Sequence, residues 1–242
     1  MALQAVNPAT GERLAAYEEM PLDEVRNIID KAHKAYLDWR RTSFRSRAAL
    51  MRQAAQVLRS NAAEYAHLMA EEMGKPMRAG AAEVQKCALG CDYYAENAAR
   101  FLAPEVVKTE ARKSFVTCQP LGVVLAVMPW NFPFWQVFRF AAPGLMAGNA
   151  AVLKHASNVP GCALAVEQIF RKAGFPENLF RTLMIGSRSV DAVIEHPLTR
   201  AVTLTGSGPA GRAVASKAGI KPGVSVTEPK PMPDSLPRSG GS

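Results

Sequence analysis

The chain lacks any apolar run of the roughly 18 residues that a membrane-spanning helix requires. Its opening residues, MALQAVNPATGE, also lack the basic region and the long apolar run of a secretory signal peptide. We therefore expect a protein with no membrane partner, located in the cytoplasm.

Cysteine is scarce, with four in 242 residues. Their positions (Cys87, Cys91, Cys118 and Cys162) fit neither a disulfide framework nor a zinc-binding pattern. Cys87 and Cys91 lie one helical turn apart, but the sequence offers no second pair of ligands beside them. We expect these thiols to pack in or near the core and predict no metal site.

A stripe of basic residues with aromatic side chains between them, typical of nucleic-acid binding, is missing as well. The net charge is +8, yet the basic residues are spread along the chain apart from one cluster that contains Arg40, Arg41, Arg45, Arg47 and Arg52. We interpret this cluster as a solvated helix end and predict no nucleic-acid partner. A positive surface also attracts anionic substrates and phosphates in general.

The segment from residue 121 to residue 157 organises the rest of the chain. Leu121–Met128 is apolar and rich in Val and Leu, which is typical of a strand buried on both faces of a parallel sheet. A helix is expected over Pro133–Ala147, because Pro suits a first helical turn and Gly148-Asn149 is a helix stop. Ala150–Lys154 is then a second buried strand, so the segment is a strand–helix–strand crossover unit.

Helices precede this unit and more alternating elements follow it. Apolar residues at helical spacing predict helices over residues 21–39, 43–73 and 77–101, which we expect to cover the sheet. Strands are predicted at residues 178–185 and 201–205, with helices at 160–173 and 190–195 and a last helix that follows the Gly206–Gly211 segment and ends near Ala218-Gly219. The predicted fold is α/β, a Rossmann-like doubly wound parallel sheet with an N-terminal helical layer.

The last residues differ in composition. Residues 222–242 contain five prolines, no aromatic residue and no periodicity, and they end in PRSGGS. We predict one α/β domain over residues 1–221 and a disordered Pro-rich tail over residues 222–242.

Three features of the sheet's carboxyl edge suggest chemistry, because ligands of open α/β sheets bind there. The Asn131 amide can donate to a developing oxyanion, or it can simply cap the following helix. The Lys154 ammonium suits hydroxyl or phosphate groups. Gly206–Gly211 is a glycine-rich turn before a helix, a weak but compatible signal for a bound phosphate.

The residues themselves are more specific than the pattern. MPWNFP at residues 128–133, a lysine 23 residues after the asparagine, and LTGS at residues 204–207 resemble the NAD(P)-dependent aldehyde dehydrogenase superfamily. NPATGE at 7–12, EEMGKP at 71–76 and WNFPFWQVFR at 130–139 most resemble its succinate-semialdehyde dehydrogenases. The resemblance spans roughly residues 5–222 and covers only the cofactor-binding front half of that family.

The resemblance implies roles for individual residues. Asn131 and the backbone N–H of the family's nucleophilic cysteine would both donate hydrogen bonds to the developing oxyanion. Lys154 would bind the adenosine ribose, and Ser157 stands where NAD-preferring members carry a glutamate, so NADP is tolerated and the cofactor is NADP or NAD. Further residues expected along the cofactor are Met128, Pro129, Trp130, Gly206, Ser207 and Ala210.

The resemblance also implies a substrate and an assembly. Arg139, eight residues after Asn131, matches an arginine that pairs with the distal carboxylate of succinate semialdehyde. A structural arginine between Phe138 and Phe140 is the alternative. The region of about 103–121 corresponds to a hairpin used in subunit association, so a homo-oligomer is expected of the full family member.

Two elements of the family's chemistry have no counterpart in this sequence. No cysteine follows Cys162, and Glu228 stands in Pro-rich sequence without the family's Leu-Glu-Leu-Gly-Gly context. We therefore expect an aldehyde dehydrogenase that is truncated and inactive as this chain. The alternatives are a non-catalytic nucleotide-binding or assembly module, and an unstable fragment with an exposed sheet edge.

Overall fold

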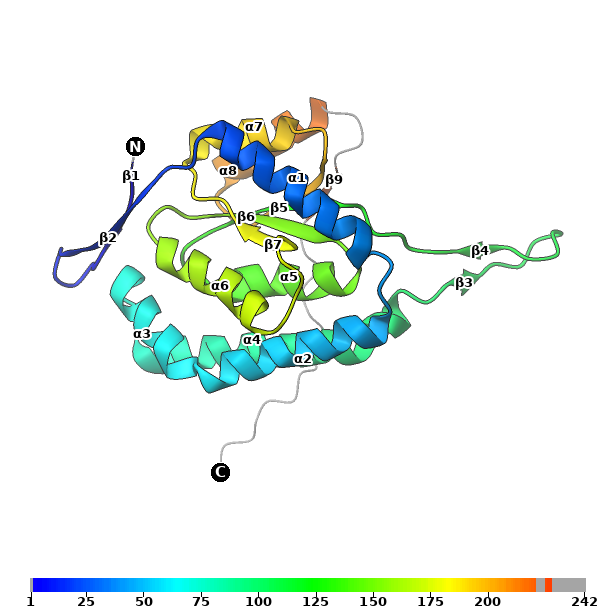
Figure 1. Cartoon of the computed structure of the whole chain (residues 1–242), viewed down its shortest axis with the longest axis horizontal. Coiled ribbons are helices and arrows are strands. Elements are labelled where there is room, and N and C mark those ends of the chain that lie inside the picture. Colours follow the sequence, from blue (N-terminus) through cyan, green and yellow to red (C-terminus); the bar gives the residue numbers. More distant parts are fainter. Residues whose placement is uncertain (1, 221–224, 228–242) are drawn as a thin grey trace.

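A five-stranded parallel sheet forms the centre of the computed structural model, which describes residues 2–220 and 225–227 (Figure 1). The strands are ordered β7-β6-β5-β8-β9, and all four pairings are parallel. Their bounds are β5 Val123–Met128, β6 Ala150–His155, β7 Phe180–Thr182, β8 Thr199–Leu204 and β9 Ser225–Thr227. Almost every residue of β5 and β6 is buried, as their apolar composition predicts.

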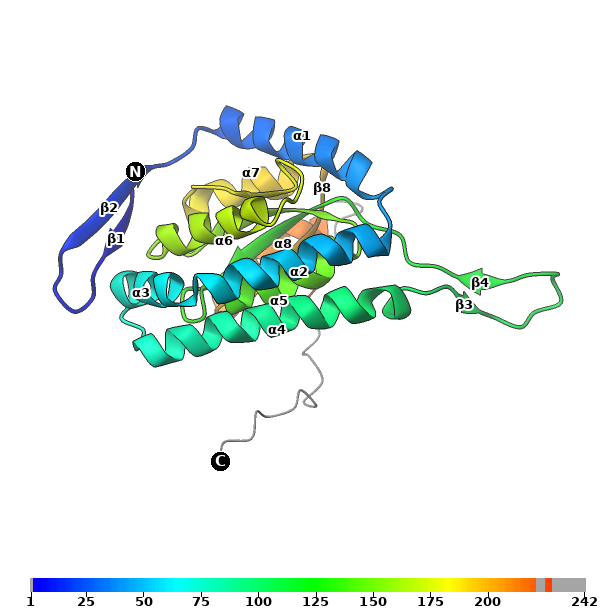
Figure 2. The ribbon, with the colours of Figure 1, turned by 60° about the horizontal axis from the view of Figure 1, so that its bottom comes forward.

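Helices cover both faces of this sheet (Figures 1 and 2). Helices α5 (Trp135–Met146) and α6 (Pro160–Lys172) lie on one face. The opposite face carries α1 (Leu22–Trp39), α7 (Val190–Glu195) and α8 (Gly208–Ile220), with a short 3-10 turn at Ser187–Ser189 before α7. Because successive crossovers use both faces, the predicted doubly wound α/β fold is confirmed.

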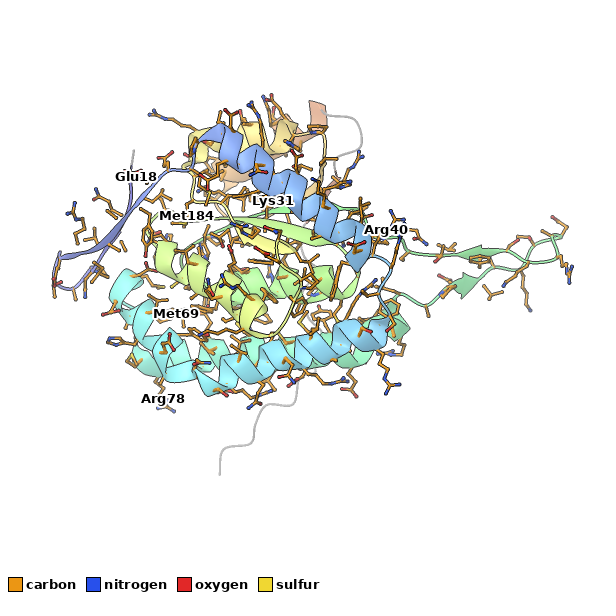
Figure 3. The ribbon with its side chains drawn as sticks, viewed as in Figure 1. Glu18, Lys31, Arg40, Met69, Arg78 and Met184 are labelled. Atoms are coloured by element: carbon orange, nitrogen blue, oxygen red, sulfur yellow. The ribbon has the colours of Figure 1, made fainter. Side chains whose placement is uncertain are left out.

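A third layer of helices packs on α5 and α6. It consists of α2 (Phe44–Ser60), α3 (Ala62–Met73) and α4 (Met77–Phe101). Met69 of α3 is buried inside this layer, and Arg78 at the start of α4 is exposed on its outside (Figure 3). The predicted N-terminal helical layer is therefore present, except that α1 covers the other face.

The single helix predicted over residues 43–73 is wrong, because the helix breaks at Asn61. This residue has φ −117° and ψ 20°, outside the helical region, and its side chain donates to the carbonyl oxygen of Val57 at 2.7 Å. The backbone N–H of Asn61 donates to the same oxygen at 3.2 Å, so the amide adds a second hydrogen bond at the carboxyl end of α2. The break lets α3 change direction towards α6.

Two hairpins extend from the body of the molecule (Figure 2). The first joins β1 (Ala2–Val6) to β2 (Arg13–Glu18), and the second joins β3 (Glu105–Val106) to β4 (Phe115–Val116). The second hairpin lies within the segment of about 103–121 expected to mediate subunit association. Its apolar side chains are exposed, with Val106 at 75% and Val116 at 57%.

Two strand predictions differ from the structure. The strand expected over residues 178–185 is limited to β7, because only residues 180–182 pair in register with β6, with one backbone hydrogen bond from β6 to Leu179 and one from Leu183 to β6. Ser225–Thr227, expected in a disordered tail, instead forms β9 beside β8, where Val226 and Thr227 suit an extended edge. Residues 221–224 and 228–242 lie outside the described part of the chain, so the tail prediction is untested there.

The basic cluster is only partly the solvated surface that the sequence predicts. Arg40 is exposed at the end of α1 (Figure 3), but the Arg47 side chain is buried. Arg47 donates to the carbonyl oxygens of Met146, Trp39 and Arg40 at 3.0–3.2 Å. It therefore fixes the carboxyl end of α5 against α1.

Among the described residues, no helix is long and apolar enough to cross a bilayer.

Asn149 ties the beginnings of β5 and β6 to α5. Its side-chain oxygen accepts from the backbone N–H groups of Leu121 and Gly122 at 2.7 and 3.2 Å, and its amide donates to the Gly144 carbonyl at 3.2 Å. The residue before it, Gly148, has φ +95°, a conformation that glycine adopts without strain. The predicted helix stop at Gly148-Asn149 is confirmed, and Asn149 also orders the sheet.

We expect Asn149→Ala to lower the free energy of unfolding by about 3 kcal/mol, because it leaves buried N–H groups without acceptors. Urea unfolding of the purified chain measures this change. Asn158→Ala, which alters an exposed asparagine in the turn after β6, is the matched control and should change stability by less than about 0.5 kcal/mol. Equal effects of the two substitutions would contradict the assigned role.

Candidate functional site

The sheet has a topological switch point between β5 and β8. From β5 the chain crosses to β6 and β7 on one side, and then returns to β8 and β9 on the other. In open α/β sheets, ligands bind where the strand order reverses, outside the carboxyl ends of the strands. The loops that follow β5, β6 and β8 all open at this edge.

The register of the sheet aligns the residues predicted for the site. Val127 of β5 pairs with Lys154 of β6 on one side and with Leu204 of β8 on the other. The N–H of Thr205 donates to the carbonyl oxygen of Val127 at 3.0 Å, which continues the pairing one residue further. Trp130-Asn131, Lys154 and Gly206-Ser207 therefore leave the sheet at one rim, as predicted.

A hollow of about 250 Å³ lies between the loops after β5 and β8. It is lined by Pro129, Trp130, Asn131, Gln136, Thr205, Gly206 and Ser207. The Trp130 side chain is 50% exposed, while Met128, at the end of β5, is buried. The hollow thus offers an aromatic face, an amide and a glycine turn to a ligand from solvent.

The N-terminus of α8 faces this hollow through the glycine turn. The Ser207 hydroxyl accepts from the N–H of Ala210 at 3.5 Å, and the Ser207 carbonyl accepts from the N–H of Gly211 at 2.9 Å. Ser207 thus acts as the cap of the helix, and Pro209 stands in the first turn, where its missing N–H costs nothing. The positive end of the helix dipole suits an anionic group at Gly206-Ser207.

Lys154 and Ser157 lie one strand away along the same rim. The Lys154 side chain is partly buried, and desolvation lowers the pKa of its ammonium, while the Glu19 carboxylate acts in the opposite direction. Ser157 is exposed in the turn between β6 and α6. A cation beside a small hydroxyl side chain is compatible with an anionic or hydroxyl-rich ligand.

Asn131 does not cap α5. Its side-chain oxygen accepts from the N–H of the adjacent Phe132 at 3.1 Å. The first N–H groups of α5, those of Phe134 and Trp135, instead donate to the buried carboxylate of Glu83 on α4, each at 2.9 Å. Because the helix takes its cap from α4, the capping interpretation of Asn131 is wrong and its amide lines the hollow.

Arg139 lines a second hollow of about 310 Å³, which shares no lining residue with the first and extends to Leu121 and Asn149 at the beginnings of β5 and β6. Its side chain donates to the Thr205 hydroxyl at 3.3 Å, and Tyr94 and Thr203 line the same space. Within the described part of the chain, Nε of Arg139 and Oγ1 of Thr203 are buried without a hydrogen-bond partner. A guanidinium with a free donor in a hollow is suited to a carboxylate.

Tyr94, Gln136, Thr203 and Thr205 also line the two hollows, and no sequence pattern predicted them. Thr205 lies inside the LTGS motif, so the sequence indicated its position but not the side chains that it contacts. Tyr94 lies on α4, and only the packing of α4 against α5 brings it to Arg139. No local sequence pattern predicts such a contact between two helices.

None of the four cysteines lines either of these hollows. Cys87, Cys91 and Cys162 are buried, and desolvation raises the pKa of all three thiols. Cys118 is exposed but lines another hollow, beside Arg40 and Ser43. Among the described residues, no group of three His, Cys, Asp or Glu side chains is arranged to hold a metal ion.

Comparison with known proteins identifies the family. The profile of the aldehyde dehydrogenase family matches residues 1–227. The chain belongs to the aldehyde dehydrogenase family. A probable succinate-semialdehyde dehydrogenase (NADP+) of Synechocystis sp. is 51% identical over 218 residues, which are 90% of this chain and 48% of that protein. Succinate-semialdehyde dehydrogenase (NADP+) 1 of Mycobacterium tuberculosis is 48% identical over 229 residues, 93% of this chain and 50% of that protein.

Solved structures agree with these relatives. Succinic semialdehyde dehydrogenase from Streptococcus pyogenes, crystallised with NADP+ as the cofactor, superposes with a TM-score of 0.90 at 35% identity, over 94% of this chain and 50% of that one. Succinate-semialdehyde dehydrogenase from Burkholderia pseudomallei gives a TM-score of 0.88 at 27% identity, over 93% and 47%. The chain thus spans about half the length of the relatives that it matches.

His155 joins β6 to the loop after β5. Its ring Nε2 lies 2.9 Å from the Pro133 carbonyl oxygen, and Nδ1 accepts from the N–H of Ala156 at 2.8 Å. These partners require a neutral ring with its proton on Nε2. Burial lowers the pKa of His155 from 6.5 to about 4, with the Lys154 charge acting in the same direction.

We expect His155 to make the fold sensitive to acid. Because its folded-state pKa is lowered, the unfolded chain takes up a proton first, so stability is lost as pH falls from 6.5 towards 4. Urea unfolding should show the wild type losing about 2 kcal/mol more than His155→Gln between pH 7 and pH 5. NMR titration of the imidazole gives an independent check, and protonation of the native ring above pH 6 would contradict the assignment.

Proposed function

We propose that this chain binds NADP at the rim between β6, β5 and β8, as the cofactor-binding part of a succinate-semialdehyde dehydrogenase. The observation that carries the proposal is the register that sends Asn131, Lys154 and Gly206-Ser207 to one edge at the topological switch point. The NADP named for the relatives above supports the choice of cofactor. The whole protein would oxidise succinate semialdehyde to the acid.

The rim residues suit the parts of a dinucleotide in order. The Lys154 ammonium donates to ribose hydroxyls and attracts a 2′-phosphate, and Ser157 presents no negative charge beside it. The N-terminus of α8 at Gly206-Ser207 suits the pyrophosphate, with Ala210 partly buried in its first turn. When bound, the nicotinamide supplies the hydride acceptor. Met128, Pro129 and Trp130 would line its approach.

Asn131 and Arg139 are assigned to the aldehyde. The amide of Asn131 would donate to the oxygen that becomes negative when a nucleophile adds to the carbonyl, an interaction worth about 100- to 1000-fold in rate. Arg139, which lines the second hollow, would bind the distal carboxylate. The Thr205 hydroxyl holds the guanidinium between the two hollows.

Turnover needs a nucleophilic thiolate, and we propose that these 242 residues do not supply one. The three buried thiols are kept protonated by desolvation, and Cys118 lines a different hollow. The chain by itself would therefore be a nucleotide-binding and assembly module. The exposed β3–β4 hairpin, with Phe115 and Val116, is the surface that we assign to association between subunits.

The cofactor assignment predicts that the chain binds NADP without oxidising succinate semialdehyde. Isothermal titration calorimetry measures binding, and absorbance of NADPH measures turnover. Ser157→Glu should weaken NADP binding at least about tenfold, because the new carboxylate repels the 2′-phosphate, while NAD binding stays within about threefold. The control is Ser187→Glu, an exposed serine in the turn before α7. Equal loss of NADP and NAD affinity in Ser157→Glu would contradict the assigned position of the 2′-phosphate.

The substrate assignment predicts that Arg139 binds a carboxylate. In NMR titrations with succinate as the probe, Arg139→Met should weaken binding about 10- to 100-fold, the loss expected for a charge-assisted hydrogen bond. Arg212→Met, which removes an exposed arginine of α8, is the control. Unchanged succinate affinity in Arg139→Met would overturn this assignment and leave the cofactor proposal intact.

A further inference from the structure

We infer that Lys75 and Glu83 are positioning residues that fix the backbone of the Asn131 loop, so that its amide is held ready at the rim. This inference rests on the role proposed above for Asn131. Lys75 belongs to the EEMGKP segment, and the function proposed above gives no role to any residue of that segment. Neither residue lines the two hollows described above.

Lys75 reaches the loop from the connection between α3 and α4. The residue before it, Gly74, ends α3 in the left-handed conformation with φ +71°, which turns the chain sharply at this point. The Lys75 ammonium donates to the carbonyl oxygen of Asn131 at 2.9 Å and lies 4.0 Å from the centre of the Phe132 ring. The Lys75 side chain therefore holds both Asn131 and the neighbouring Phe132 in place.

Glu83 completes the arrangement from α4. One carboxylate oxygen accepts from the N–H groups of Phe134 and Trp135, and the other forms an ion pair with Lys75. The side chains of Lys75 and Glu83 are only 8% and 1% exposed. Every charge in this pair thus has partners, and all of the backbone partners lie in residues 131–135.

A third contact comes from the sheet. The His155 ring donates to the Pro133 carbonyl, so polar side chains from α4, from the α3–α4 connection and from β6 hold the loop. The backbone is fixed at residues 131, 133, 134 and 135, while the Asn131 side chain remains exposed. A donor to an oxyanion must be held to about 0.5 Å, and this network provides that restraint.

Stability alone gives no reason for a buried ion pair here. Replacing such a pair by apolar residues is often neutral or stabilising, because desolvation offsets the attraction. Capping α5 requires only Glu83, yet Lys75 extends the contacts to Asn131 and Phe132. The geometry therefore points to positioning of the loop as the role of the pair.

Three variants of the full chain test this inference: Lys75→Met, Glu83→Gln and the control Arg47→Met. The control also converts a buried cation that binds backbone carbonyls into methionine, but at the opposite end of α5. NMR follows the side-chain amide of Asn131, assigned with Asn131→Asp. Hydrogen exchange follows the amides of Phe134 and Trp135, and thermal unfolding reports overall stability.

In Lys75→Met we expect at least tenfold faster exchange of the Phe134 and Trp135 amides, and an Asn131 side-chain signal that moves towards its position in the unfolded chain. Glu83→Gln should give the same changes with a smaller amplitude. It replaces Lys75→Met as the test variant if Lys75→Met does not fold. Arg47→Met should lose stability and leave the Asn131 signal in place.

An unchanged Asn131 signal in a folded Lys75→Met or Glu83→Gln would overturn the inference, as would an equal change in Arg47→Met. NADP titration of the wild type separates this result from the proposed function. Failure to bind NADP would refute the cofactor assignment, whereas the NMR comparison reports on the loop whether or not nucleotide binds.

Discussion

The parallel pairing of β5 with β6 and β8 is the constraint on which the rest of the structure depends. It places Val127, Lys154 and Leu204 in one line across the sheet. Because each strand then ends at the same edge, residues more than 70 positions apart become neighbours without any special contact between them. A register slip of one residue would turn alternate side chains to the opposite face and separate them. The site is thus a consequence of sheet pairing, and the loops only refine it.

Helix α5 connects this register to the loop chemistry, and polar groups fix it at both ends. Arg47 and Asn149 bind the carbonyl groups of its last turn, while Glu83 accepts from the N–H groups of its first turn. The two ends are therefore clamped by α2 and β6 on one side and by α4 on the other. Since Asn131 precedes this helix and Arg139 lies within it, the position of α5 sets the distance between the two groups assigned to the aldehyde.

Sequence patterns predicted the parts of this arrangement that depend on local physics. The apolar composition of β5 and β6 and the stop at Gly148-Asn149 required no tertiary information. The break at Asn61 was missed because apolar spacing continues through it, and the interruption is seen only in the backbone conformation of Asn61 and its side-chain bond to Val57. The contact of Lys75 with Asn131 was equally invisible, since 56 residues separate donor and acceptor. Long-range polar contacts have no periodic signal, whereas buried strands and helix ends do.

Both hollows contain buried polar atoms without a hydrogen-bond partner among the described residues. At the rim hollow, the backbone around Asn131 and the helix cap at Ser207 take their hydrogen bonds from within the described residues. Among those residues, Gln136 Oε1 at the rim hollow and Arg139 Nε and Thr203 Oγ1 at the second hollow are buried without a hydrogen-bond partner. Buried polar groups are normally satisfied, so each hollow offers polar atoms that can pair with a ligand. On the functions proposed above, the unpaired atom of the rim hollow would meet the cofactor and those of the second hollow would meet the substrate.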